Sequence, residues 1–253
     1  MAVRGEKRLS SGVYFLASYT WSHALDLGTT DDFSAAGFDQ KKYDRGNGDY
    51  DVRQRAVFSY VYELPFGHGK QFMGGAPGVV DKIVGGWEWN GITAFSTGQY
   101  ETPSLPVDWI NAGAFSTSHP DLVGNPVPAH GRSYTNYWNI NAFAYPGCEG
   151  KTTGTSLDCD TATVIQGDHI EGTARRNSLE APGVNNWDMG LIKRTHITER
   201  LNTQFTAQAQ NAFNHTQFGG PGSSISPGSF GVITSTNVVH GARVLQLSFK
   251  LMF

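Results

Sequence analysis

Apolar and polar residues alternate along six segments of the chain, and a period of two is the signature of a strand with two different faces. In the clearest segment, from Leu201 to Phe213, the odd positions are mostly apolar and the even positions are almost entirely amides and hydroxyls. The pattern predicts an all-β, antiparallel chain. The predicted strands lie near residues 12–23, 52–64, 86–97, 186–196, 201–213 and 243–253.

Alternation alone does not separate a membrane barrel from a soluble β-sandwich, whose strands also have two different faces. The polar faces of this chain carry Gln, Asn, Ser and Thr with few Lys or Glu, which suits a water-filled lumen. Bulky aromatic residues lie near the strand ends, as in the two interfacial girdles of a membrane barrel. The predicted girdle residues are Tyr19, Trp21, Tyr60, Tyr62, Trp87, Trp89 and Trp187.

The connections between the predicted strands also alternate in length, although Pro65–Gly85 is longer than a usual periplasmic turn. Membrane barrels have short periplasmic turns and long outer loops, so we expect the long loops outside the cell and the C-terminus in the periplasm. The longest loop exceeds what a compact domain leaves structureless, so short strands or turns are expected around Asp108–Phe115 and Tyr137–Phe143. The three long loops are 24–50, 98–185 and 214–242.

The last predicted strand ends on an aromatic residue, with apolar residues at alternate positions before it. This pattern is typical of the final strand of bacterial outer-membrane barrels, which the barrel assembly machinery reads. A soluble edge strand that happens to end on Phe is the alternative, but an unpaired apolar strand is an aggregation hazard in water. We therefore predict an assembly signal formed by Leu245, Leu247, Phe249, Leu251 and Phe253.

Composition and charge narrow the class of protein further. Charged residues make up 16% of the chain, against about 25% in an average soluble domain. A net charge of −3 argues against a nucleic-acid partner, which favours a basic surface. No apolar run reaches the roughly 18 residues of a transmembrane helix, whereas a barrel strand needs only about 9–11 residues. Because the N-terminus has no apolar signal-peptide core, we expect a piece of a longer exported precursor or a misassigned start.

The sequence contains no constellation typical of an enzyme. The eight histidines lack the HExxH zinc pattern and no G-x-S-x-G elbow occurs, so we expect no catalytic residues, no cofactor and no metal. Cys148 and Cys159 lie close together and are predicted to form a disulfide in an exported protein, with two free thiols as the alternative. The acidic stretch Asp44–Asp51 could hold Ca²⁺, but a solvated loop is the favoured interpretation.

Four blocks of the sequence resemble a known family. They are RNSLEAPGVNNWDMGLIKRTHITERLNTQFTAQAQNAFNHTQFG (Arg176–Gly219), DYDVRQRAVFSYVYELPFGHGK (Asp49–Lys70), GGWEWNGITAFSTGQ (Gly85–Gln99) and the final SFGVITST…ARVLQLSFKLMF. In order and spacing, these blocks resemble the C-terminal barrel of Oar-like TonB-dependent receptors of the acidobacterial type, over essentially the whole chain. Such receptors have 22-stranded barrels with an N-terminal plug. The resemblance implies that this chain supplies roughly the last six strands of a larger outer-membrane barrel.

Six strands cannot close a membrane barrel, for which about eight is the usual minimum, so we expect a curved, open antiparallel sheet with two free edges. By the resemblance, its partners are outer-membrane lipid, the plug and remaining barrel strands of the same receptor, the barrel assembly machinery, and TonB through the plug. The predicted function is to bind a scarce solute at the outer loops and to admit it by plug gating. An outer-membrane adhesion or surface-scaffold barrel and a secreted soluble β-sandwich that binds carbohydrate are the alternatives.

Overall fold

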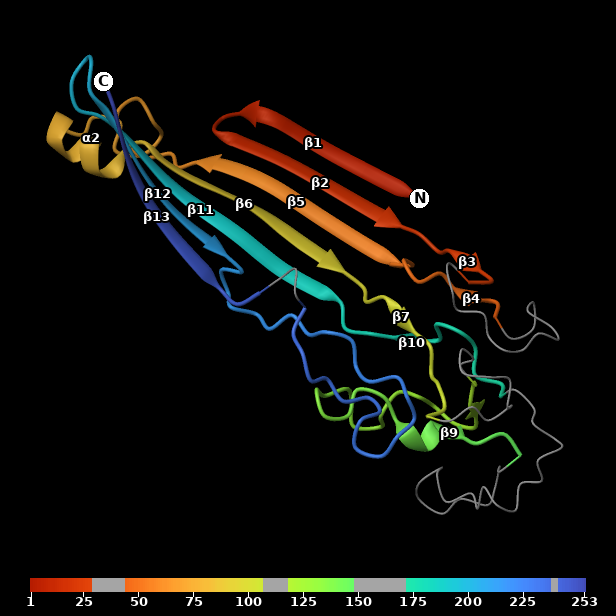
Figure 1. Cartoon of the computed structure of the whole chain (residues 1–253). Coiled ribbons are helices and arrows are strands. Elements are labelled where there is room, and N and C mark those ends of the chain that lie inside the picture. The colour runs from red at the N-terminus through yellow and green to blue at the C-terminus, as the bar shows by residue number, and fades with distance from the viewer. Residues whose placement is uncertain (29–43, 107–117, 148–171, 238–240) are drawn as a thin grey trace.

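The computed structural model describes residues 1–28, 44–106, 118–147, 172–237 and 241–253, and its main feature is one antiparallel sheet of seven strands (Figure 1). The strand order is β1-β2-β5-β6-β11-β12-β13, so each long strand pairs with the next long strand along the chain. The strands are β1 (Ala2–Ser10), β2 (Val13–Trp21), β5 (Gln54–Glu63), β6 (Trp87–Ser96), β11 (Val184–His196), β12 (Asn202–Gln210) and β13 (Val244–Met252).

The first strand, β1, corrects the sequence prediction of about six strands. Its sequence AVRGEKRLS places Arg4, Glu6 and Arg8 on one face and gives the other face only two bulky apolar residues, so the alternation is masked by charge. Ser11 and Gly12, both with positive φ, form the two-residue turn from β1 to β2. Such primed turns match the twist of an antiparallel hairpin, and the Ser-Gly pair was the signal that could have revealed β1.

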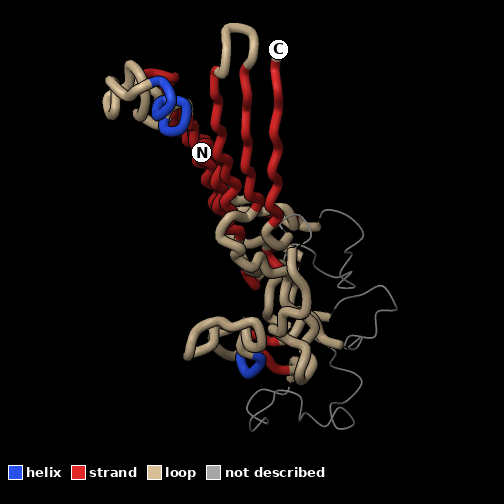
Figure 2. The backbone as a smooth tube through the Cα atoms, turned by 90° about the vertical axis from the view of Figure 1, so that its left-hand side faces the viewer, coloured by secondary structure: helices blue, strands red, loops and turns tan. Residues whose placement is uncertain are grey.

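The sheet is open, as the sequence predicts. β1 pairs only with β2 and β13 only with β12, which leaves two free edges. We call the end with the β1–β2, β5–β6 and β11–β12 connections and the C-terminus the turn end, and the opposite end the loop end. Figure 2 shows the strands extending from the loops gathered at the loop end to the turn end.

Strand register gives the sheet one apolar and one polar face, because directly paired residues point to the same side. One apolar row joins Phe15, Tyr60 and Gly91, and continues through Met189 and Ala209 to Leu245. The polar face carries the intervening positions. Its polar members include Arg4, Glu6, Ser18, Thr20, Arg55, Ser59, Glu63, Glu88, Asn90, Ser96, Asn186, Asp188, Arg194, Gln204, Thr206, Gln208, Gln210, Gln246, Ser248 and Lys250.

The β5–β6 connection at the turn end is a folded excursion rather than a tight turn. It contains the helix α2 (Gly78–Val84), whose Lys82 Nζ donates to the carbonyl oxygen of Ile197 in the β11–β12 turn at 3.2 Å. The Trp87 indole donates to the Ile83 carbonyl oxygen at 3.0 Å, which fixes the helix at the start of β6. Among the described residues, no helix is long and apolar enough to cross a membrane.

The long connections at the loop end fold together into a cap, formed by residues 22–28, 44–53, 97–106, 118–147, 172–183 and 211–237. Three small sheets tie it: β3 (Leu25–Asp26) with β4 (Gly46–Asn47), β7 (Tyr100–Glu101) with β10 (Leu179–Glu180), and β8 (Asp121–Leu122) with β9 (Phe143–Ala144). A 3-10 helix, Ile140–Ala142, precedes β9, where a short element was expected. The other expected element, Asp108–Phe115, lies outside the described residues.

The buried apolar core of the described chain lies in the cap and not in the sheet. Trp138 and Phe143 both pack against Phe230, with ring centroids 5.8 and 5.4 Å apart, so the second and third long connections share one core. Fully buried aromatic residues of this size dominate packing energetics. The core residues are Trp138, Ala142, Phe143, Ala174, Leu179, Ala181, Ile225 and Phe230.

Candidate functional site: the polar face and the hollow beneath the cap

The seven predicted girdle residues all lie on the apolar face, in two groups at opposite ends of the strands. Tyr60, Tyr62, Trp87 and Trp89 lie toward the turn end, and the rings of Tyr60 and Trp89 are 4.9 Å apart. Tyr19, Trp21 and Trp187 lie toward the loop end. There Trp187 also contacts the rings of Phe95 and Phe213. Aromatic residues toward both ends of the strands are expected at two membrane–water interfaces. Here the rings of Phe15 and Phe58, 6.1 Å apart, continue the aromatic surface between the two groups.

The predicted C-terminal signal residues form a continuous exposed row along β13. Leu247 pairs with Ala207 and is 70% exposed, and Phe249 pairs with Phe205 and is 65% exposed. Described residues cover this row only from the β12 side, because β13 is a free edge. An apolar row of this extent far exceeds the scattered exposed leucines of a soluble protein.

The opposite face presents neutral amides and hydroxyls with a few paired charges. Arg194 and Glu88 form an ion pair of 2.7 Å across β11 and β6. Asp188 accepts a hydrogen bond of 2.8 Å from the backbone N–H of Asn211, whose positive φ ends β12 before the predicted limit of residue 213. The neutral amides and hydroxyls of this face can form hydrogen bonds with a polar solute.

A buried polar cluster around Arg176 corrects the expectation that Asp44–Asp51 is a solvated stretch. The Arg176 side chain is 3% exposed; its Nη1 lies 2.7 Å from an Asp49 carboxylate oxygen, and its Nη2 pairs with Asp26. Its Nε donates to the Asp44 carbonyl oxygen at 3.1 Å. Burial lowers the pKa of Arg176.

These carboxylates are therefore used to join two long connections of the cap. Asp51 is likewise buried and pairs with Arg53 at 3.0 Å. Within the described ranges, no group of three or more His, Cys, Asp or Glu residues could hold a metal ion. Cys148 and Cys159 lie outside the described residues.

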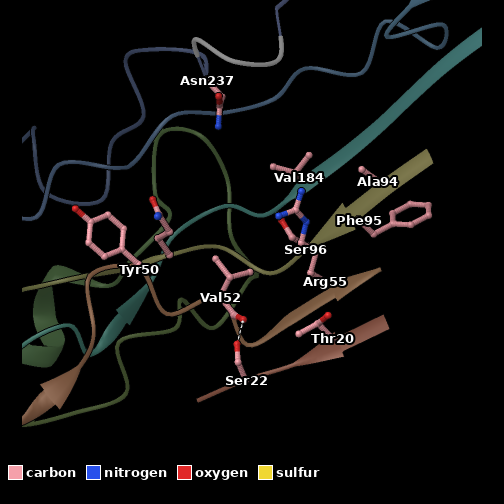
Figure 3. A pocket seen from close by; sticks show the side chains of 11 residues that line it. Thr20, Ser22, Tyr50, Val52, Arg55, Ala94, Phe95, Ser96, Val184 and Asn237 are labelled. Carbon is pink, nitrogen blue, oxygen red and sulfur yellow. Dashed lines mark hydrogen bonds between the residues drawn. The ribbon is translucent and has the colours of Figure 1, made fainter. Parts of the chain in front are cut away.

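A hollow of about 670 Å³ opens on the polar face at the loop end, where the sheet meets the cap (Figure 3). One cross-strand row, Thr20, Arg55, Ser96 and Val184, forms its sheet side. Cap residues complete it, and Figure 3 shows Tyr50 on the side of the hollow away from the Arg55 guanidinium. The lining residues are Thr20, Ser22, Tyr50, Val52, Arg55, Ala94, Phe95, Ser96, Gln99, Val184 and Asn237.

Arg55 lies near the start of the strand predicted at residues 52–64, but no sequence pattern indicated this hollow. Residues from four strands and three loops build it, and their meeting depends on the fold of the cap. Its volume lies within the range of about 300–1,000 Å³ that is usual for small-molecule sites. The hollow is therefore the candidate binding site.

An antiparallel sheet with one exposed apolar face that is rich in aromatic residues toward both strand ends, and one amide-rich face, defines a β-barrel protein of the outer membrane. A family model described as an outer membrane beta barrel domain matches residues 1–246. The chain belongs to this family, and its location is the outer membrane. No curated protein and no solved structure matches the chain. The alternative of a secreted soluble sandwich is wrong, since the family is a membrane one and the long strands form a single sheet.

Proposed function

We propose that this chain is the C-terminal barrel part of a TonB-dependent receptor of the Oar-like type, which binds a scarce solute and admits it by movement of a plug. The observation that carries the proposal is the hollow at the loop end of the polar face, where a solute would meet the lumen. The resemblance of the four sequence blocks supports the receptor type. Binding and conformational gating, rather than bond chemistry, are the proposed mechanism, and the protein is proposed not to be an enzyme.

The proposed partners follow from the two faces and two edges of the sheet. The apolar face would contact outer-membrane lipid, and the polar face would contact the plug. The free edges of β1 and β13 would pair with the remaining barrel strands, since an unpaired backbone group in lipid costs several kcal/mol. The barrel assembly machinery would read the row from Leu245 to Phe253, and TonB would act through the plug.

Binding to TonB tests the receptor proposal without knowledge of the solute. The open reading frame upstream of Met1 should encode a plug and a TonB box, and the full-length protein should bind the purified periplasmic domain of TonB in calorimetry. A deletion of the TonB box should abolish that binding. Full-length protein that lacks a plug, or that shows no interaction with TonB, would contradict the proposal.

A surface scaffold or adhesin is the second candidate, and the cap favours it. Loops that share an apolar core around Trp138 and Phe230 form a folded surface of the kind that can carry adhesion. Under this candidate, cells that express the full protein would adhere to a surface through the cap while a solute uptake assay shows no difference. A TonB box in the same chain would count against it.

A further inference from the structure

The hollow beneath the cap is lined by one positively charged side chain, that of Arg55, and no described residue neutralises its charge. Arg55 is exposed, and its guanidinium makes no hydrogen bond or ion pair with any residue in the part of the chain that the structure describes. Its neighbours across the strands, Thr20 and Ser96, are neutral. Among the described residues that line the hollow, Arg55 is the sole charged one.

Three other arginines of the described chain are held by carboxylates, in contrast to Arg55. Arg53 pairs with Asp51 at 3.0 Å and lies over the Tyr100 ring, and Arg176 is held by Asp49. Arg194, on the same polar face, pairs with Glu88. Arg55 alone of these four points a planar fork of donors toward an open hollow, and that fork matches the two oxygens of a carboxylate.

The rest of the lining fits a hydroxylated solute with one apolar side. Ser22, Gln99 and Asn237 add neutral polar groups to those of Thr20 and Ser96. Tyr50 is 83% exposed, and its ring offers a flat apolar surface on which the C–H face of a sugar could lie. A single guanidinium balances a singly charged carboxylate better than a doubly charged phosphate.

We propose that the hollow binds a carboxylated carbohydrate, with its carboxylate on Arg55, its hydroxyl groups on the neutral side chains, and one sugar face on Tyr50. This inference rests on the proposed function in that it names the class of solute that the receptor would admit. Beyond the proposed function, it assigns the binding site to the cross-strand row that contains Arg55 and to the cap residue Tyr50.

Calorimetry on the full-length protein in detergent tests the proposal, with trigalacturonic acid as the probe and neutral galactotriose as its uncharged counterpart. The acidic trisaccharide should bind and the neutral one should bind at least tenfold more weakly. Arg55→Gln should weaken binding of the acidic probe roughly 10–100-fold, the value of a charge-assisted hydrogen bond, and Arg55→Lys should recover part of the loss. Arg200→Gln, at the turn end, is the matched control and should bind as the unaltered protein does.

A second pair of variants separates binding from folding. Tyr50→Ala should weaken binding, whereas Tyr134→Ala, at an exposed cap tyrosine outside the hollow, should not. Each variant should keep the heat-modifiable mobility of a folded barrel. The proposal is overturned if trigalacturonic acid does not bind, if both trisaccharides bind equally, or if Arg55→Gln binds as the unaltered protein does.

The outcomes also separate this inference from the receptor proposal. Charge-dependent binding at Arg55 in a protein that does not interact with TonB would support the carbohydrate site in the hollow and refute the receptor proposal. Interaction with TonB in a protein that shows no preference for the acidic probe would support the receptor and refute the solute class.

Discussion

Arg176 is the residue on which the polar half of the cap depends. It pairs with Asp49 and Asp26, which lie far from it in the sequence, and the neighbouring Asn177 side chain donates to the Asn47 carbonyl oxygen at 2.8 Å. Breaking a fully buried pair costs about 3–5 kcal/mol. The two carboxylates here keep about a third of their exposure, so the cost is expected to be lower.

Arg176→Ala is therefore expected to destabilise the cap by about 2 kcal/mol and leave the sheet intact. Limited proteolysis of whole cells that display the protein should show faster cleavage of the cap, with no change in heat-modifiable mobility. Arg175→Ala is the control, because Arg175 is the exposed neighbour in the same segment. Equal cleavage rates for the two variants would show that the Arg176 cluster does not hold the connections together.

His119 gives the cap a dependence on pH. Burial lowers the pKa of His119 below its ordinary value of 6.5, against the opposing effects of Asp44 and of a backbone hydrogen bond at Ala174. The unfolded cap therefore binds a proton more readily than the folded cap. The stability that His119 contributes is complete above about pH 6.5 and is lost as the pH falls through the lower pKa of the folded state.

Acidification from pH 7 toward pH 5 should thus accelerate protease cleavage of the cap. His119→Gln, which cannot take up a proton, should flatten this dependence, whereas His68→Gln at the turn end should not change it. A cap whose acid sensitivity is the same with and without His119 would rule out this residue as its source.

At the scale of elements, β13 allows a matched comparison of the two faces of the sheet. Leu247 and Gln246 are adjacent and both exposed, but Leu247 lies in the apolar row and Gln246 faces Gln208 across the polar face. An arginine facing lipid near the bilayer midplane costs about 2–4 kcal/mol, whereas an arginine facing water costs little.

Leu247→Arg should lower the fraction of folded protein in outer membranes, and Gln246→Arg should leave it nearly unchanged. The folded fraction is measured by heat-modifiable mobility and by protection from urea extraction. A greater loss with Gln246→Arg would mean that the polar face, and not the apolar face, is the one in contact with lipid.

The elements also mark how far the sequence could predict the structure. Period-two alternation located six of the seven long strands, because each has one apolar face. It missed β1, whose face around Arg4 and Glu6 is charged, and it extended β12 past Asn211, where a positive φ turns the chain. The small paired strands of the cap are two residues long and carry no periodic signal.

The candidate site was less predictable for a physical reason. Arg55 lies within the strand predicted at residues 52–64, but its hollow exists only because the cap brings Tyr50 and Asn237 to the loop end of the sheet. Likewise, no local pattern around Arg176 indicates that it meets Asp49 from another connection. Contacts between distant loops are set by packing, which alternation along one strand does not encode.

For the whole molecule, strand direction restricts how the barrel can be completed. Strands alternate in direction across seven members, so β1 and β13 both run from the loop end to the turn end. Direct pairing of these two edges would be parallel, whereas outer-membrane barrels are antiparallel. An antiparallel barrel that contains this sheet therefore needs an odd number of further strands between its edges.

A structure of the full-length protein should show an odd number of strands between β1 and β13. A cysteine pair introduced at Glu6 and Ser248, one on each edge strand, should not form a cross-link. Efficient cross-linking of this pair would indicate a closed seven-stranded barrel and would contradict the open sheet.

The central claim is that the apolar face of the sheet contacts hydrocarbon and the polar face contacts water. Nitroxide labels placed singly at positions 245 to 252, in full-length protein whose native cysteines are replaced by serine, test it most directly in native outer membranes. Labels at 245, 247, 249 and 251 should collide preferentially with oxygen, and labels at 246, 248 and 250 with a water-soluble nickel chelate. Uniform accessibility along β13, or the opposite alternation, would contradict the membrane orientation and the solute path built on it.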